Sequence, residues 1–219
     1  MPRQSFHPRR PVVLTVIVAV MGLAWLCPLA HVASADDHRY PRPALYPESW
    51  QLDFEAAIPQ RIVVEVPGRG PQAYWYLTYT VTNRTDREQL FMPVFELLTH
   101  DGNVYRSDRG VPAVVFDRIK QREKKPLLEP FHQIAGTLLV GEDQARDGVA
   151  IWQEPPGRMG AFSIFVEGLS GETATVKLGE RDVILRKQLQ LNFHIRGDEF
   201  FRGEDDVNPA DDAETWVMR

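Results

Sequence analysis

Residue types that could act as a nucleophile, or as its base, are sparse in this chain. The single cysteine, Cys27, lies inside a long apolar run. Ser170 in the stretch GLSGE is flanked by glycines, but the strand-to-helix turn of a nucleophile elbow is not indicated around it. We therefore interpret GLSGE as a turn that follows a strand. We expect no catalytic residue, and a hydrolase whose active site is assembled from distant residues is the alternative.

Histidines are equally scattered. Beyond the first 35 residues they occur singly, without the His-x-His or His-x-x-x-His spacing of a transition-metal site. These four positions are His38, His100, His132 and His194. His100 and Asp101 come nearest to a ligand pair, but the stretch THDGN is a turn signal.

Acidic residues cluster near the C-terminus and offer the hard oxygen ligands that calcium takes. The candidate calcium ligands are Asp198, Glu199, Glu204, Asp205 and Asp206, followed by Asp211, Asp212 and Glu214. Their spacing does not match the twelve-residue calcium loop. A solvated acidic surface without a cofactor is therefore our first interpretation, and a calcium-binding module is the alternative.

Tyrosines mark the most regular strand pattern, QAYWYLTYTVTN at residues 72–83. Because side chains alternate along a strand, one face carries Trp75, Leu77, Tyr79 and Val81 and should be core. The opposite face carries Tyr74 and Tyr76 beside threonines and should face solvent. Exposed aromatic side chains can form a binding surface. We therefore predict Tyr74 and Tyr76 as ligand-binding residues for a glycan or a peptide, and cross-strand packing is the alternative.

Residues 1–35 have the features of a signal peptide. Arg3, Arg9 and Arg10 precede the apolar stretch PVVLTVIVAVMGLAWLCPLA, and ASA stands directly before Asp36, where a signal peptidase would cut. We expect export to the periplasm or the exterior of a bacterium. The alternative is an uncleaved anchor in the inner membrane through residues 11–30, which is close to the length of a transmembrane helix.

Removal of residues 1–35 would change the charge and the redox chemistry of the chain. The segment holds three arginines and no acidic residue, so the basic residues fall from 25 to 22 against 30 acidic ones, and the net charge of −5 becomes −8. Such a charge disfavours nucleic acid as a partner. No cysteine would remain, so the domain must be stabilised by its core rather than by disulfides, which suits a bacterial envelope protein.

The rest of the chain divides into three parts. Residues 36–49 are proline-rich and predict an extended leader, residues 50–196 predict one folded domain, and residues 197–219 predict an acidic tail that is mostly loop. Expected strands cover residues 61–66, 72–83, 90–99, 104–105, 133–140, 147–153, 160–169 and 182–195. Pro93 should make the strand at 90–99 an edge strand or give it a bulge.

One helix is expected among these strands. The stretch VPAVVFDRIKQREKK, residues 111–125, has a proline in its first turn, apolar residues at helical spacing and cations at its end. At least seven short strands with one helix, and no regular alternation of the two, predict a mainly β fold. We expect an antiparallel β-sandwich with one helix inserted between strands, and a closed barrel is the alternative.

The stretch from Trp75 to Tyr105 resembles the immunoglobulin-like β-sandwich modules of exported bacterial proteins. It carries the strand YTVTN, an acidic turn, the strand FELL, the turn DG and a terminal tyrosine. The helix and the missing Cys–Trp–Cys core depart from the antibody pattern. Such modules are generally non-catalytic, so the resemblance implies binding or scaffolding and transfers no functional residue.

These observations together predict an exported, non-catalytic β-sandwich module of the bacterial cell envelope. Its expected role is binding or structure, and its expected partner is an envelope protein or a glycan. A membrane partner is expected only if residues 1–35 stay attached. The alternatives are an envelope hydrolase, a calcium-binding module and a glycan-binding module.

Overall fold

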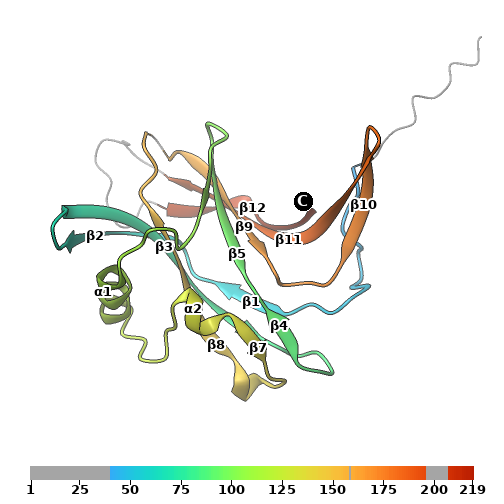
Figure 1. The fold of residues 1–219 in the computed structure, drawn as a ribbon, viewed down its shortest axis with the longest axis horizontal. Helices are drawn as coiled ribbons and strands as arrows, with labels where there is room; N and C mark the ends of the chain where they lie inside the picture. The colour runs from blue at the N-terminus through green and yellow to red at the C-terminus, as the bar shows by residue number, and fades with distance from the viewer. Residues whose placement is uncertain (1–39, 158, 196–206) are drawn as a thin grey trace, which may run out of the picture. The chain divides into compact units, whose positions relative to one another are not determined.

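The computed structural model of the chain describes residues 40–157, 159–195 and 207–219. Within these residues the fold is mainly β, as the sequence predicts, with every pairing between the named strands antiparallel (Figure 1). The strands are β1 (Asp53–Ala56), β2 (Gln60–Val66), β3 (Gly70–Thr82), β4 (Gln89–Phe91), β5 (Val94–Thr99), β6 (Val104–Arg106), β7 (Gly136–Leu138), β8 (Arg146–Gln153), β9 (Ala161–Glu167), β10 (Thr173–Leu178), β11 (Arg181–Ile195) and β12 (Val207–Met218). The helices are α1 (Ala113–Glu123), α2 (Phe131–Ile134) and the 3-10 turn η1 (Glu142–Gln144).

The first sheet is built around the long strand β3. β1 and β2 pair with successive parts of one edge of β3, and β8 pairs with the other edge. The expected strands at 61–66 and 72–83 are confirmed as β2 and β3. Gly68 in the turn between them and Gly70, the first residue of β3, both have positive φ, a backbone conformation that favours glycine.

The second sheet has the strand order β10-β11-β9-β5-β6, with β12 on the remaining edge of β11. β9 and β10 pair with successive parts of β11, so that β10 and the first half of β11 form a two-stranded arm. β6 pairs only with β5 among the described strands and forms the opposite edge of this sheet.

The two sheets share one hydrophobic core, an arrangement that fits a β-sandwich. Side chains of β3 and β8 from the first sheet pack with side chains of β5, β9 and β11 from the second. The face of β3 predicted as core is confirmed, because its four members are at most 3% exposed. These four are Trp75, Leu77, Tyr79 and Val81.

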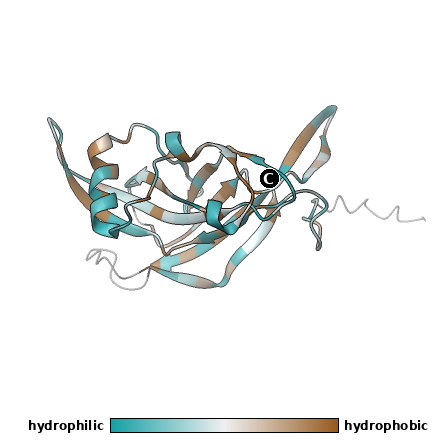
Figure 2. Cartoon of the chain, turned by 90° about the horizontal axis from the view of Figure 1, so that it is seen from below, coloured by the Kyte–Doolittle hydropathy of each residue, from teal (hydrophilic) through white to brown (hydrophobic). Residues whose placement is uncertain are grey.

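A second core lies on the other face of the first sheet, where helix α1 covers it. Val115 and Ile119 of the helix are fully buried and pack with β2, β3 and β8. Figure 2 shows that α1 carries both hydrophilic and hydrophobic residues. The predicted helix with one packed side is therefore confirmed, and the first sheet is buried on both faces over the part that α1 covers.

Two expected strands differ from the structure. The stretch at 90–99 is divided into β4, which pairs with β7, and β5, which belongs to the second sheet. Pro93 stands at the division and has no N–H for a ladder, and Gly168 lies so close that an added Cβ would be 2.9 Å from the Met92 carbonyl oxygen. The stretch at 133–140 is the end of α2 followed by β7.

The expectation that the C-terminal tail is mostly loop is wrong for residues 207–218. These residues form β12, which pairs with β11, and Trp216 packs against the shared core opposite Leu189. The free edge of β11 supplies the backbone partners that an isolated acidic segment would lack. The leader is anchored as well, because the Ala44 N–H donates to Glu172 Oε1 at 2.7 Å.

Candidate functional site

A short segment, Tyr105–Arg109, joins the edges of the two sheets, and we call it the strap. The Ser107 N–H donates to the Phe95 carbonyl of β5 at 3.0 Å, and the Asp108 N–H donates to the Ile151 carbonyl of β8 at 2.7 Å. The Trp152 indole N–H donates to the Tyr105 carbonyl at 3.0 Å. Because the strap bonds to both sheets, its backbone is held in place between them.

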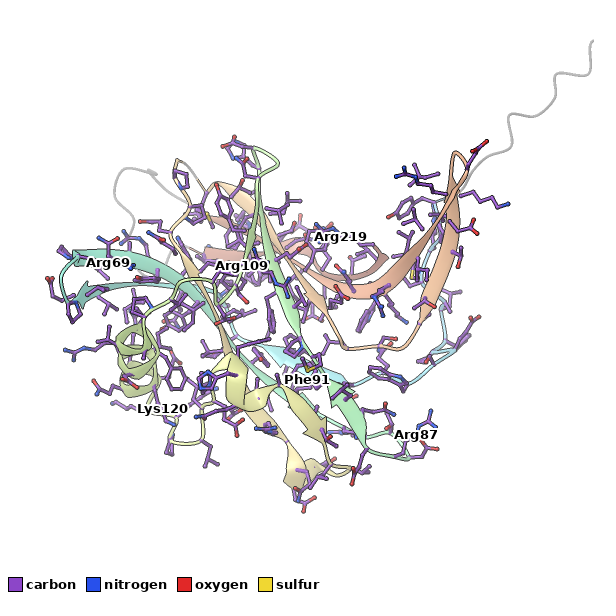
Figure 3. The ribbon with its side chains drawn as sticks, viewed as in Figure 1. Arg69, Arg87, Phe91, Arg109, Lys120 and Arg219 are labelled. Atoms are coloured by element: carbon purple, nitrogen blue, oxygen red, sulfur yellow. The ribbon has the colours of Figure 1, made fainter. Side chains whose placement is uncertain are left out.

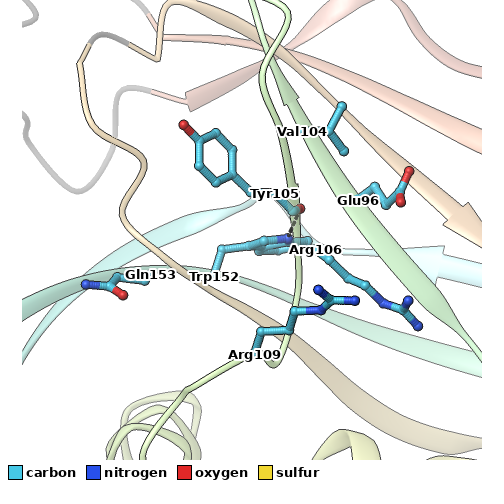
Figure 4. Close-up of a pocket in the computed structure, with 7 residues that line it drawn as sticks. All are labelled: Glu96, Val104, Tyr105, Arg106, Arg109, Trp152 and Gln153. Atoms are coloured by element: carbon cyan, nitrogen blue, oxygen red, sulfur yellow. Dashed lines mark hydrogen bonds between the residues drawn. The ribbon is translucent and has the colours of Figure 1, made fainter.

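A cavity of about 480 Å³ lies along the strap, within the size range of small-ligand sites. We call it the arginine pocket; its lining residues are Glu96, Val104, Tyr105, Arg106, Arg109, Trp152 and Gln153. Figure 4 shows the Arg106 and Arg109 side chains extending to the same side of the strap. Both are exposed, and neither guanidinium has a hydrogen bond or ion pair with another described residue.

The unpaired state of Arg106 has a local cause. Glu96 lies directly opposite Arg106 in the β5–β6 pairing and would be its natural partner. The Glu96 carboxylate is instead bonded by Arg219, with Nη1 at 2.5 Å from Oε2, and the Arg219 guanidinium also lies 4.3 Å from the ring centre of Phe165. Arg109 and Arg219 are both labelled in Figure 3. The pocket therefore combines two free guanidiniums with a carboxylate that is already neutralised.

Asp108 is the titratable group of the strap with the most unusual surroundings. Its backbone is left-handed, with φ of 60°, and the Ser107 hydroxyl donates to Oδ2 at 2.5 Å. Burial raises the pKa of Asp108 to about 6, although the bonds from Ser107 and from the backbone act in the opposite direction. Cavities of about 290 and 280 Å³ lie against Asp108, and Phe131 lines both. A carboxyl whose pKa is raised by burial thus lies beside the arginine pocket.

The expectation that Tyr74 and Tyr76 face solvent is wrong. Their exposed fractions are 2% and 1%, because α1 covers this face of β3. The Tyr76 hydroxyl donates to Glu123 at 2.7 Å and lies 3.0 Å from the Gln60 amide oxygen, so helix α1 also satisfies its polar end. The two tyrosines stabilise the packing of α1 and present no surface on which a glycan could lie.

The candidate calcium ligands Asp198, Glu199, Glu204, Asp205 and Asp206 lie outside the described residues. Asp211, Asp212 and Glu214 lie in β12. Within the part of the chain that the structure describes, no group of three or more histidine, cysteine or acidic side chains is placed to hold a metal ion.

The remaining residues singled out by the sequence lie in separate turns and strands. Ser170 Oγ accepts the Glu172 N–H at 3.2 Å, as expected of a turn. His100 lies 2.9 Å from Asp101 at the exposed β5–β6 turn. His132 lies in α2 and His194 in β11, and His38 falls outside the described residues. The sequence interpretation missed the strap, whose one visible signal is the turn-like stretch RSDRG with two arginines three positions apart.

In residues 40–157, 159–195 and 207–219, no helix has both the length and the apolar character needed to cross a bilayer. No protein-family model, curated protein sequence or solved structure matches the chain. What the site can do follows from its own residues.

Proposed function

We propose that the protein is an exported, non-catalytic module with an immunoglobulin-like β-sandwich that binds an anionic ligand of the bacterial envelope in the arginine pocket. The observation that carries the proposal is the pair Arg106 and Arg109. Two guanidiniums line one cavity and no other described residue satisfies them. Guanidinium groups present several fixed N–H donors that match the geometry of a carboxylate or a phosphate.

The surroundings of the pair support the same ligand class. Val104 also lines the pocket and is 46% exposed, so it supplies apolar surface next to the charged groups. The chain as a whole is acidic, with a net charge of −5, whereas the lining of the arginine pocket holds two arginines and one acidic residue. The strap backbone bonds to both sheets and places both arginines along the same cavity.

A hydrolase is the second candidate, and the observation that favours it is the hydrogen-bonded pair Ser107 and Asp108. A carboxyl with a pKa near neutrality is typical of acid–base catalysis. The geometry favours binding nevertheless, because Ser107 is 8% exposed and its hydroxyl is taken up by Asp108 itself. A nucleophile in this place would need access to substrate.

The proposal is tested by the double variant Arg106→Gln, Arg109→Gln. The matched control is Arg69→Gln, Arg87→Gln, which removes the same charge from two exposed turns that lie outside the arginine pocket. Retention of the purified protein is measured on beads carrying polygalacturonate or polyglutamate, with dextran beads as the neutral reference.

The wild-type protein and the Arg69, Arg87 control should be retained on at least one anionic matrix and released by salt, since exposed charge interactions are screened. The Arg106→Gln, Arg109→Gln variant should be retained on the anionic beads no more than on the neutral dextran beads. Equal retention of the two double variants would refute the proposal, and so would a wild-type protein that no anionic matrix retains.

A further inference from the structure

A second concave site lies on the outer face of the second sheet, the face turned away from the shared core. It has a volume of about 470 Å³. Its polar lining comes from five segments: β5, the β5–β6 turn, β9, β11 and β12. We call it the amide groove after Gln190 and Asn192 of β11; its other polar lining residues are Thr99, His100, Ser163, His194 and Asp212. Among the described residues, no lysine or arginine lines it.

An irregularity of β12 forms one wall of this groove. Leu191 pairs with Glu214 and Phe193 pairs with Pro209, so the residues between Pro209 and Glu214 stand opposite Asn192 alone. The Asn192 amide compensates by donating to the Asp212 carbonyl at 2.8 Å. Bulges of this kind redirect side chains and are frequent beside functional sites. Here the bulge places Ala210 and Asp212 along the groove.

The polar side chains of the groove are held by one another. Asn192 Oδ1 accepts hydrogen bonds from the Ser163 hydroxyl at 2.7 Å and from the Gln190 amide at 2.8 Å. Neither Gln190 Oε1 nor the Asp212 carboxylate bonds to any other described residue. The groove thus offers hydrogen-bond acceptors next to the apolar side chain of Leu98. A hydroxyl group of a ligand can both donate and accept a hydrogen bond, so closely spaced amides and acceptors suit it better than they suit an ion.

One transverse row of side chains connects the amide groove with the arginine pocket. Arg106 pairs with Glu96, Glu96 with Phe165, and Phe165 with Gln190. Paired residues of adjacent antiparallel strands point to the same face of the sheet. With strands spaced by about 4.8 Å, the row spans about 14 Å from Arg106 to Gln190. Arg219 lies over Phe165 at the middle of this row.

We infer that the ligand is an acidic oligosaccharide, whose carboxylate lies in the arginine pocket and whose hydroxyl groups bond to Gln190 and Asp212 in the amide groove. This inference rests on the proposed function of the arginine pocket. An acidic peptide fits less well, because peptides are commonly recognised by strand addition at a sheet edge, whereas the amide groove lies on a sheet face.

The test is isothermal titration of the full purified protein with three probes: oligogalacturonate, a neutral maltooligosaccharide of equal length, and oligoglutamate. The variants are Gln190→Ala in the groove and Gln188→Ala as the matched control. Gln188 lies on the same face of β11 but bonds to Glu167 outside the groove. Thermal melts verify that each variant is folded.

Wild-type protein should bind oligogalacturonate more tightly than either other probe. Gln190→Ala should weaken that binding by about three- to tenfold, as expected for one lost hydrogen bond, and should leave the affinity for oligoglutamate unchanged. Gln188→Ala should have no effect on either affinity.

Two results separate the failure of this inference from the failure of the proposed function. If oligoglutamate binds as tightly as oligogalacturonate, or if Gln190→Ala has no effect, the sugar assignment is overturned while the arginine pocket stands. If the Arg106→Gln, Arg109→Gln variant binds oligogalacturonate like wild type, both are overturned.

Discussion

Replacing Asp108 by asparagine should stabilise the protein at neutral pH and leave its stability unchanged in acid. Asparagine has nearly the same shape, tolerates the left-handed backbone at this position, and its amide oxygen can still accept the Ser107 hydroxyl. The substitution therefore removes the charge of a buried carboxyl with little other change.

The sign and the size follow from the raised pKa. Asp108 has a pKa of about 6 in the folded state and about 4 when unfolded, so the unfolded chain releases the proton first as the pH rises. Stability is therefore complete below about pH 4, is lost between about pH 4 and 6, and stays reduced above that range. Two pH units correspond to about 3 kcal/mol.

Urea unfolding of wild type and Asp108→Asn across this pH range measures the effect. The variant should gain up to about 3 kcal/mol in free energy of unfolding at pH 7.5, and the gain should disappear below about pH 4. Asp182→Asn, which removes an exposed carboxylate on β11, is the control. A difference between Asp108→Asn and wild type that does not vary with pH would refute the reasoning.

Three further changes test the packing around the site. Glu172→Gln should lower the free energy of unfolding by about 3–5 kcal/mol in urea titrations, because it leaves the buried charge of Lys187 without its partner. The Lys187 side chain is only 4% exposed, and its Nζ lies 2.8 Å from Glu172 Oε2. A loss below about 1 kcal/mol would contradict this. Tyr79→Phe should be neutral or stabilising by about 1 kcal/mol, since the buried hydroxyl has no hydrogen-bond partner among the described residues. A marked loss of stability would contradict this. Gly148→Ala should lower the melting temperature, because an added Cβ would lie 2.4 Å from Tyr79 Cζ and 2.6 Å from Ile134 Cδ1; an unchanged melting point would contradict the close packing.

The alternation along β3 illustrates what the sequence can predict and where it stops. A period of two separates Trp75 and Leu77 from Tyr74 and Tyr76 correctly, because strand geometry alone sets which residues share a face. Whether the face of β3 that carries the two tyrosines is exposed to solvent depends on helix α1, which begins almost 40 residues further along the chain. Helix α1 buries Tyr74 and Tyr76, and no local pattern in β3 indicates it.

Lys187 interrupts the apolar face that the sequence predicts for β11, and the structure gives the reason. Its ammonium group bonds to Glu172, and it lies 5.1 Å from the ring centre of Trp216 in β12. Both partners come from segments that the sequence indicated as turn or loop. A buried lysine can be predicted only together with its partner, and that pairing is a property of the folded chain.

The strap could not be identified from sequence for a related reason. Its position depends on backbone bonds to Phe95 and Ile151, and backbone groups carry no residue signature. The arginine pocket likewise needs Arg219, the last residue of the chain, to occupy Glu96 and leave Arg106 free. The sequence therefore indicates the β class and one core face, and the candidate site emerges only when distant segments are brought together.

The most direct test of the central claim is to observe the two arginines during binding. In nitrogen-15 NMR spectra, the side-chain Nε–H signals of Arg106 and Arg109 should shift in a saturable manner as oligogalacturonate is added, while those of Arg69 and Arg87 should stay in place. Saturable shifts confined to other arginines, or small uniform shifts of all of them, would contradict the arginine pocket as the binding site.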